Sequence, residues 1–381
     1  MANGTGPEPP GGGLVDHHCH GVARGPLTEA RFLSYLTESD APAAEGTTFF
    51  DSQLGFAVRR WCPPLLGLPA HCPPADYLAR RAELGAEEAT RRLLRATGIT
   101  DYVVDTGLAD DITTPGELAA AGDARAHEIV RLETVAERTA ERAGTSREFL
   151  DGLQEAVHAA ARTALGFKSV AAYRHGLGFD PAPPGPGELG AAADRLLAGR
   201  DAGLRVDDPV LLRHLLWTAA GTALPLQIHT GFGDPDLRLH RSDPALLTDF
   251  VKAVRPTGCP LVLLHAYPYH RNAAYLAHVF PHVYADVGLT LSYTGARAAA
   301  VLAEVLELAP FGKVLFSTDA YGLPELYVAG SRLFTQALGR LTEAWVGEGA
   351  WAAADAPRIA GLIGSGNARR LYGLPPAEGS G

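Results

Sequence analysis

The sequence predicts an α/β fold in which eight parallel strands alternate with helices and close into a (β/α)8 (TIM) barrel. Short apolar runs rich in β-branched residues recur along the chain, and most are separated by Ala-, Leu-, Arg- and Glu-rich segments with helical spacing. Alternating strands and helices favour a parallel sheet, and eight such units favour a closed barrel. An open doubly wound sheet is the alternative, but it usually carries a glycine-rich phosphate-binding turn after its first strand. The first run is not followed by such a turn.

The predicted strands and the segments between them follow in order. The strands are residues 13–20, 101–107, 128–134, 165–173, 224–231, 259–267, 282–290 and 313–320. Residues 21–98 are too many for a plain connection between a strand and its helix, and helical pieces flank a proline-rich segment there. We therefore predict a long, mostly helical insertion after strand 1. Residues 359–374 are typical of a closing helix.

One barrel domain is predicted over residues 14–374. The chain length of 381 residues suits a single large barrel with insertions, and the hydrophobic share of 46% is enough for a sizeable core. Residues 1–13 are rich in glycine and proline, so we expect a disordered leader. Residues 375–381 are expected to form a short tail.

Charge and composition restrict the classes of function. The net charge of −10 supplies no basic stripe for phosphates, so we expect neither a nucleic-acid partner nor binding to an anionic membrane. No apolar run approaches the ~18–20 residues needed to cross a bilayer, and the N-terminus lacks the pattern of a secretory signal. The four cysteines are too few and too scattered for a disulfide framework. These features predict a cytoplasmic protein that acts on a small molecule.

Reactive side chains lie where the predicted strands end. His18 and His20 end the first run, and His229, His265 and Asp319 lie at the ends of the fifth, sixth and eighth. In a (β/α)8 barrel the active site lies at these strand ends. Because side chains alternate across a strand, His18 and His20 point to the same side and can bind one ion. A single such histidine is more often structural, but the whole set points to a metal site.

Imidazole and carboxylate ligands suit Zn²⁺ first, with Fe²⁺, Mn²⁺ or Co²⁺ as alternatives. Zinc with an open coordination position would lower the pKa of its water to about 7. Asp319 could then take a proton from that water and give it to a leaving group. His265 could either ligate a metal or polarise a substrate carbonyl.

Lys168, in the fourth run, allows two interpretations. It is one of three lysines in the chain. A lysine can react with CO₂ to form a carbamate that bridges two metals, which an always-protonated arginine cannot do. Alternatively, an unmodified ammonium binds a substrate carboxylate or phosphate. Glu133, Tyr173 and Arg174 are weaker candidates for contacts with substrate at the barrel mouth, and a salt bridge at the rim is an equal alternative for Arg174.

Six motifs, taken in order, resemble the amidohydrolase superfamily: VDHHCHG, GFKSVAAYR, QIHTGFGD, LLHAYPY, LFSTDA and NARRLYGL. More narrowly, they resemble the amidohydrolase-related branch, which includes the nodulin-like domain found fused to glutamine synthetase in some proteins. The resemblance runs from residue 14 to residue 374 and implies a metal-dependent (β/α)8 barrel.

The resemblance also implies a role for each residue at the site. His18 and His20 match the paired first-strand ligands, and His229 matches the fifth-strand ligand. Asp319 matches the eighth-strand aspartate that serves as ligand and proton shuttle. His265 matches a histidine that is a ligand in some members and a catalytic group in others.

The number of ions stays open at this stage. Lys168 sits where members with two metals keep a carboxylated lysine. Many members with one metal lack that bridge, so the resemblance implies one or two ions.

The implied activity is hydrolysis of a C–N (amide) bond of a small molecule by metal-activated water. The branch suggests γ-glutamyl amides of small amines as substrates. Two alternatives remain: a metal-dependent decarboxylase of an aromatic or unsaturated acid on the same site, and a non-catalytic module that binds a ligand or an enzyme. No glutamine synthetase domain follows, so we expect activity that stands alone or works with a separate glutamine synthetase-like ligase. Barrels with large insertions often pair, so a homodimer is a further expectation.

Overall fold

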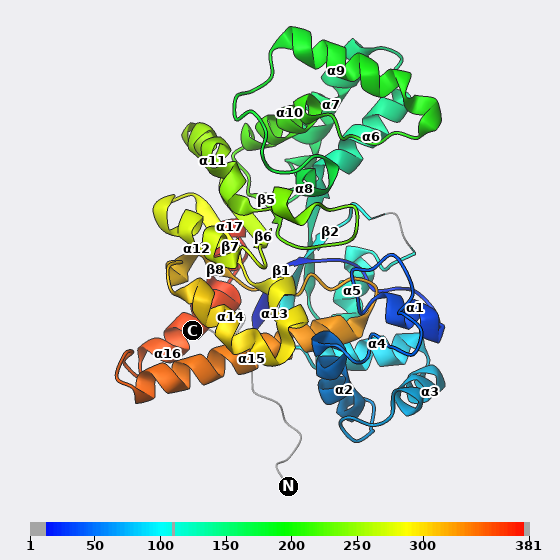
Figure 1. Ribbon diagram of the computed structural model, residues 1–381, viewed down its shortest axis with the longest axis vertical. Coiled ribbons are helices and arrows are strands. Elements are labelled where there is room, and N and C mark those ends of the chain that lie inside the picture. Colours follow the sequence, from blue (N-terminus) through cyan, green and yellow to red (C-terminus); the bar gives the residue numbers. More distant parts are fainter. Residues whose placement is uncertain (1–12, 109–110, 377–381) are drawn as a thin grey trace. The chain divides into compact units, whose positions relative to one another are not determined.

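The computed structural model describes residues 13–108 and 111–376. Its eight strands form one sheet in sequential order, and the strand pairs that are described run parallel. Helices alternate with the strands (Figure 1), so the predicted (β/α)8 barrel is confirmed. Most of the predicted leader and tail lies outside the described residues. The strands are β1 (Leu14–Cys19), β2 (Ile99–Asp105), β3 (Arg125–Arg131), β4 (Gly166–Ser169), β5 (Leu226–Thr230), β6 (Leu261–His265), β7 (Val283–Asp286) and β8 (Val314–Leu315).

The described chain forms two compact units. Unit 1 holds the residues up to Val104, those from Leu108 to His127 and those from Asp286 onward. Unit 2 holds Asp105–Gly107 and Glu128–Ala285. Strands β1, β5 and β6 are buried along their whole length, as expected for parallel strands that are covered on both faces.

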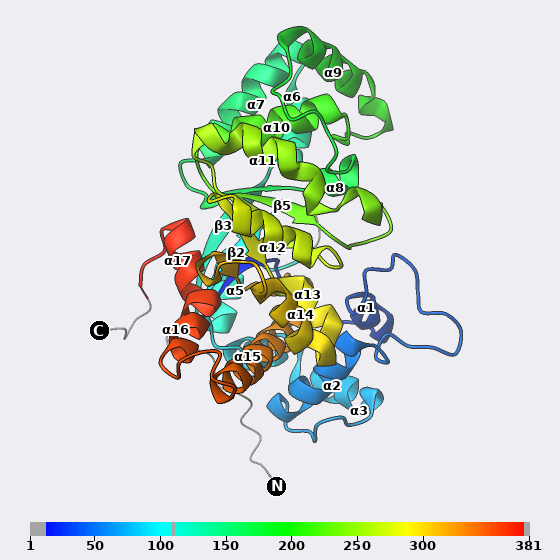
Figure 2. The ribbon, with the colours of Figure 1, turned by 60° about the vertical axis from the view of Figure 1, so that its left-hand side comes forward.

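Unit 1 is organised around the long helix α15. This helix packs against α2, α4, α13 and α14 (Figures 1 and 2), and it begins with a proline, which is well suited to the first turn of a helix. Four helices, α1 to α4, lie between β1 and β2. The helices of unit 1 are α1 (Glu29–Ser34), α2 (Gln53–Leu65), α3 (Pro74–Leu84), α4 (Ala86–Arg95), α5 (Pro115–Gly122), α13 (Gly288–Thr294), η5 (Gly295–Arg297), α14 (Ala298–Leu306), η6 (Phe311–Lys313), α15 (Pro324–Gly347), α16 (Asp355–Gly361), η7 (Leu362–Gly366) and α17 (Asn367–Tyr372).

Unit 2 carries a group of helices in which α6 packs on α7, and α10 packs on both α6 and α9 (Figure 2). Helix α10 buries its leucines, which lie at helical spacing on the side that faces the interior. The helices of unit 2 are α6 (Leu132–Arg142), α7 (Ser146–Ala160), α8 (Ala171–Arg174), α9 (Pro186–Ala198), η1 (Arg200–Ala202), α10 (Pro209–Ala220), η2 (Leu239–Arg241), η3 (Pro244–Leu247), α11 (Thr248–Val254), η4 (Arg255–Thr257) and α12 (His270–Val279).

A buried ion pair fixes the segment between β1 and β2 to α15. The Nε of Arg81 in α3 donates to Oε1 of Glu325 at 2.8 Å, and the Tyr77 hydroxyl donates to the same oxygen at 2.8 Å. Glu325 is fully buried and Arg81 is 6% exposed. Each charge depends on the other, because an unpaired buried charge is costly.

A second buried carboxylate, Asp101 in β2, ties the closing helix α17 to β2 and β3. Arg125 donates to both of its oxygens at 2.8 and 3.0 Å, and Arg369 donates to one of them at 2.7 Å. Burial by itself raises the pKa of Asp101. Hydrogen bonds from His127 and Arg125 and the charge of Arg369 outweigh burial and hold that pKa well below its usual range.

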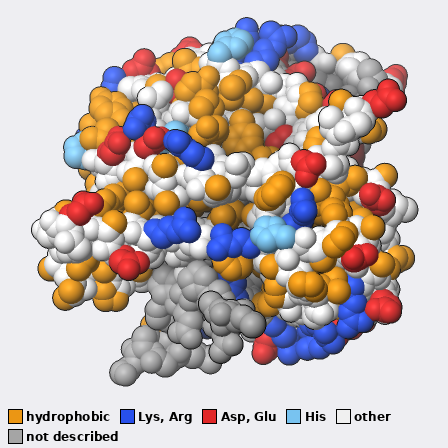
Figure 3. Space-filling model, turned by 60° about the horizontal axis from the view of Figure 1, so that its bottom comes forward, with side chains coloured by type: hydrophobic (Ala, Val, Ile, Leu, Met, Phe, Trp, Pro, Cys, Tyr) orange, Lys and Arg blue, Asp and Glu red, His pale blue; other side chains and the backbone are white. Residues whose placement is uncertain are grey.

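One face of the protein carries mixed charge. On the face drawn in Figure 3, Lys and Arg side chains are interspersed with Asp, Glu and apolar side chains, the pattern of an ordinary solvated surface. Among the helices of the described residues, none has both the length and the apolar character that crossing a bilayer requires.

The Arg81–Glu325 pair gives a test of stability. Glu325→Gln should lower the free energy of unfolding by about 3–5 kcal/mol, because it leaves Arg81 buried without a counter-charge. Urea unfolding measures this. The control is Asp355→Asn, which breaks a pair whose side chains are 59% and 42% exposed and should cost less than about 1 kcal/mol. Equal losses in the two variants would contradict this account.

Asp101 should contribute to the dependence of stability on pH. Its pKa is lower in the folded chain than in the unfolded chain, so its contribution is present above the unfolded value of about 3.9 and is lost as pH falls below it. We therefore expect Asp101→Asn to destabilise the protein most at neutral pH. The gap in unfolding free energy from wild type should narrow below about pH 4. A gap that stays constant between pH 7 and about pH 3 would argue against the assigned pairing.

Candidate metal site

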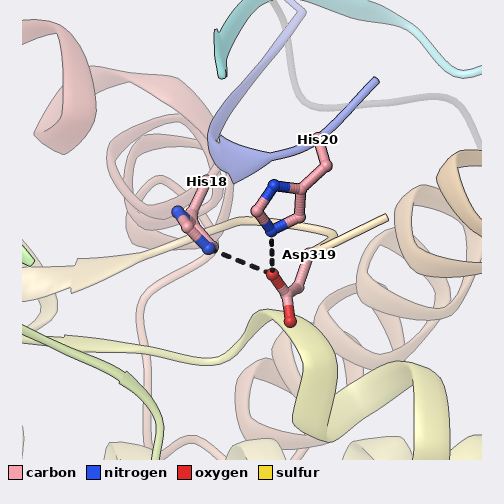
Figure 4. A group of neighbouring side chains, drawn as sticks. All are labelled: His18, His20 and Asp319. Atoms are coloured by element: carbon pink, nitrogen blue, oxygen red, sulfur yellow. Dashed lines mark ion pairs between the residues drawn. The ribbon is translucent and has the colours of Figure 1, made fainter. Parts of the chain in front are cut away.

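Three predicted ligands meet in unit 1 (Figure 4). Oδ1 of Asp319 lies 3.0 Å from Nε2 of His18 and 3.4 Å from Nε2 of His20. All three potential ligand atoms lie within 4.8 Å of one another, and this is the one such group of three or more in the part of the chain that the structure describes. The His18 side chain is fully buried, whereas that of Asp319 is 15% exposed. The aspartate is therefore the more accessible of the two.

Backbone pairing between β1 and the segment after β8 brings these residues together. The Asp319 N–H donates to the carbonyl of His18 at 3.0 Å, and the His20 N–H donates to the carbonyl of Ala320 at 2.9 Å. The Tyr327 hydroxyl, from α15, donates to the carbonyl of His20. His18 is the fifth residue of β1 and His20 follows its last residue, so strand alternation gives the two imidazoles a common side.

Asp319 adopts a strained backbone conformation. Its φ of 50° lies in the left-handed region, which costs a non-glycine residue about 1–3 kcal/mol and is concentrated at functional sites. The preceding residue, Thr318, is held by Asp16: its N–H donates to one carboxylate oxygen at 2.9 Å and its hydroxyl to the other at 2.5 Å. Burial raises the pKa of Asp16 to about 8. Asp16 is not among the residues predicted for the site, although it lies two residues before His18 on the same side of β1.

The other side of β1 carries a separate network. Nε2 of His17 lies 3.1 Å from Oδ1 of Asp286, and Nδ1 lies 3.3 Å from the Tyr372 hydroxyl. The Ser317 hydroxyl donates to the same oxygen of Asp286 at 2.9 Å. This buried network links β1 with β7 and α17. The sequence feature that could have predicted this network is the position of Asp286 at the end of the seventh strand, but Asp286 is not among the predicted site residues.

The segment between β1 and β2 contacts the loop that carries Asp319. Tyr35 packs on Gly322, whose φ is 75° and where a Cβ would overlap the tyrosine ring. The Tyr321 ring lies 5.3 Å from that of Tyr35 and 6.0 Å from that of His20, edge-on in both cases. A chain of aromatic contacts therefore connects this segment to one of the predicted ligands.

In unit 2 the structure brings together His229 and His265. Their ring centroids lie 4.8 Å apart, and the Tyr173 ring lies 4.4 Å from that of His229. Nε2 of His229 lies 3.2 Å from the Phe232 carbonyl. His265 and Ala266 both have a φ of 65°. The backbone is therefore strained at the end of β6, as it is at Asp319.

Lys168, also in unit 2, lies beside a carboxylate that the sequence analysis did not single out. Its Nζ is 3.7 Å from Oδ2 of Asp105, and Nη2 of Arg131 is 2.6 Å from the same oxygen. Lys168 is 3% exposed and Asp105 is fully buried. Asp105 is therefore shared between the side chains of Arg131 and Lys168. The sequence feature that could have identified Asp105 is its position at the end of β2.

Glu133 requires a correction. The predicted third strand, 128–134, is observed three residues earlier as Arg125–Arg131, so Glu133 lies in α6 and not in a strand. Its carboxylate accepts hydrogen bonds from the Ser169 hydroxyl at 2.6 Å and the Val170 N–H at 3.0 Å. Burial raises its pKa. These contacts join α6 to the end of β4, and a substrate contact for Glu133 stays a prediction.

Tyr173 and Arg174 end the short helix α8. Nη2 of Arg174 lies 3.1 Å from Oε1 of Glu137. This ion pair corresponds to the salt bridge that was the alternative interpretation. Tyr173, beside His229, is nearer to a predicted site residue. A substrate contact for either residue stays a prediction.

The model of the family described as amidohydrolase matches residues 15–374. Protein fluG of Emericella nidulans is 35% identical over 229 residues, which are 56% of this chain and 26% of fluG, so the match spans about a quarter of that protein.

Among solved structures, a candidate metal-dependent hydrolase from Lactobacillus casei superposes with a TM-score of 0.83 at 28% identity, covering 94% of this chain and 95% of that one. A uronate isomerase from Bacillus halodurans gives a TM-score of 0.65 at 13% identity, with coverage of 98% and 96%, and shares the fold. The family match extends over nearly the whole barrel, from the first strand to the closing helix. The chain therefore belongs to the amidohydrolase family.

Proposed function

We propose that this protein is a metal-dependent hydrolase that cleaves the C–N (amide) bond of a small molecule. The observation that carries the proposal is the convergence of His18, His20 and Asp319 within 4.8 Å in a member of the amidohydrolase family. Two imidazole nitrogens and one carboxylate oxygen fit a divalent cation, zinc first, and leave coordination positions open. Such a cation would polarise the scissile carbonyl and lower the pKa of a water molecule.

The proposed roles of the three residues in unit 1 follow from the exposure of their side chains. His18 lies in β1 and His20 directly after it, and their side chains are 0% and 7% exposed, so they are proposed as ligands. The Asp319 carboxylate is more accessible and lies next to both, which supports the proposal that it accepts a proton from water and returns it to the leaving amine. The assignments of His229 as a further ligand and of His265 as a ligand or carbonyl-polarising group stay predictions from the sequence.

The first substrates to test are γ-glutamyl amides of small amines. Support for this class comes from the resemblance of the six sequence motifs to the branch that includes domains fused to glutamine synthetase. Aromatic carboxylic acids belong in the same panel, because a decarboxylase on this site would release CO₂ and leave amides intact.

Asp319→Asn tests the proposed role of the carboxylate. Purified protein loaded with zinc should release amine from a substrate of the panel, and the variant should be at least about 100-fold slower, because it lacks the proton acceptor. The variant should keep the circular dichroism spectrum of the wild type. Asp355→Asn, on an exposed carboxylate, is the control and should retain full activity. CO₂ release without amine release would overturn the amide assignment, and unchanged turnover in Asp319→Asn would remove the proton shuttle.

We also propose that Lys168 remains an unmodified ammonium and that the protein binds one cation. Asp105 supports this, because its Oδ2 lies 3.7 Å from Nζ of Lys168 and can pair with an ammonium, whereas a carbamate would bring a second negative charge beside it. Protein reconstituted with excess zinc should hold one ion per chain, both in CO₂-depleted buffer and with added bicarbonate. Elemental analysis after gel filtration measures this. A second ion that appears only with bicarbonate would show that Lys168 is carboxylated.

A further inference from the structure

We propose that Asp16 is a positioning residue that holds Asp319 in place to share a cation with His18 and His20. This inference rests on the proposed metal site and concerns a residue outside its ligand set. Asp16 is fully buried in β1, on the same side of the strand as His18. One strand therefore carries both a ligand and the group that orients another ligand.

The contacts of Asp16 converge on a single residue. Both of its carboxylate oxygens accept hydrogen bonds from Thr318, one from the N–H at 2.9 Å and one from the hydroxyl at 2.5 Å. The Thr318 hydroxyl in turn accepts the Ala320 N–H at 3.1 Å. The residues on either side of Asp319 are thus tied, directly or through one hydroxyl, to the same carboxylate.

Asp319 needs this support because its conformation is unfavourable on its own. Its φ of 50° lies in the left-handed region, which is less favourable for an aspartate than the right-handed or extended regions. Its own N–H donates to the carbonyl of His18 at 3.0 Å. The bond from the Asp319 N–H holds the peptide group between Thr318 and Asp319. The bond from the Thr318 N–H to Asp16 holds the peptide group just before it.

A merely structural role for Asp16 makes a different prediction. The backbone bond between the N–H of His20 and the carbonyl of Ala320 already joins β1 to the segment after β8. If Asp16 only reinforced that junction, its removal would lower stability and leave metal affinity unchanged. If it positions Asp319, its removal weakens metal binding, because one ligand is no longer preorganised.

The test is a titration of the metal-free full-length protein with Co²⁺, read by its visible absorption. Asp16→Ala should raise the dissociation constant about 10–100-fold, the usual effect of losing a group that orients a ligand. Asp16→Asn should recover most of the affinity, because its amide can accept the Thr318 N–H and donate to the Thr318 hydroxyl. Thr318→Val, which removes only the hydroxyl, should give a smaller loss than Asp16→Ala.

A double variant tests whether Asp16 affects Co²⁺ binding through Asp319. Asp16→Ala combined with Asp319→Asn should bind Co²⁺ no more weakly than Asp319→Asn alone, because Asp16 acts only through Asp319. Asp101→Asn is the matched control: it also removes a buried carboxylate from a strand of unit 1, so it should lower the unfolding temperature without changing Co²⁺ affinity.

Three results would overturn the inference. They are wild-type affinity in both Asp16→Ala and Thr318→Val, additive losses in the double variant, and an equal loss in Asp101→Asn. If Asp16→Ala does not fold, Thr318→Val carries the test: it should bind Co²⁺ more weakly than the wild type, and wild-type affinity in this variant then decides against Asp16. Failure of the wild-type protein to bind Co²⁺ at all would instead remove the metal site itself, and the proposed function with it.

Discussion

The pairing of the first strand with the segment after the last is the constraint on which the candidate site depends. Two backbone hydrogen bonds, from Asp319 to His18 and from His20 to Ala320, place an aspartate from residue 319 beside imidazoles from residues 18 and 20. Loss of this register by one residue would turn the two histidines to the opposite face. The same junction that joins the first strand to the segment after the last therefore brings the candidate metal ligands together.

Buried charges around the barrel support this junction from several directions. The Arg81–Glu325 pair anchors the segment between β1 and β2 to α15, and α15 supplies the Tyr327 hydroxyl that holds the carbonyl of His20. The Asp101 cluster secures α17. The Arg81–Glu325 and Arg369–Asp101 pairs are buried, so breaking either one is costly. The strained φ of Asp319 is maintained within this framework.

The sequence predicted the structure best where side chains or apolar runs recur at a regular spacing. Alternation along β1 was sufficient to put His18 and His20 on one side, and eight recurring apolar runs were sufficient for the barrel. The third strand was predicted to begin three residues later in the chain than it does, because Arg125 and His127 are residue types that are usually solvent-exposed. In the structure both pair with Asp101 of the neighbouring strand. Asp16 and Asp105 were not singled out for a related reason: what they do depends on contacts with residues distant in sequence, which spacing along the chain does not encode.

The central claim is that His18, His20 and Asp319 bind one divalent cation, and X-ray absorption at the zinc edge of the zinc-loaded protein tests it most directly. The account predicts a first shell of nitrogen and oxygen at about 2.0–2.2 Å with the scattering signature of imidazole. In His20→Ala the imidazole contribution to the spectrum should fall by the equivalent of one ring. A sulfur shell near about 2.3 Å, or a spectrum that His20→Ala leaves unchanged, would contradict the account.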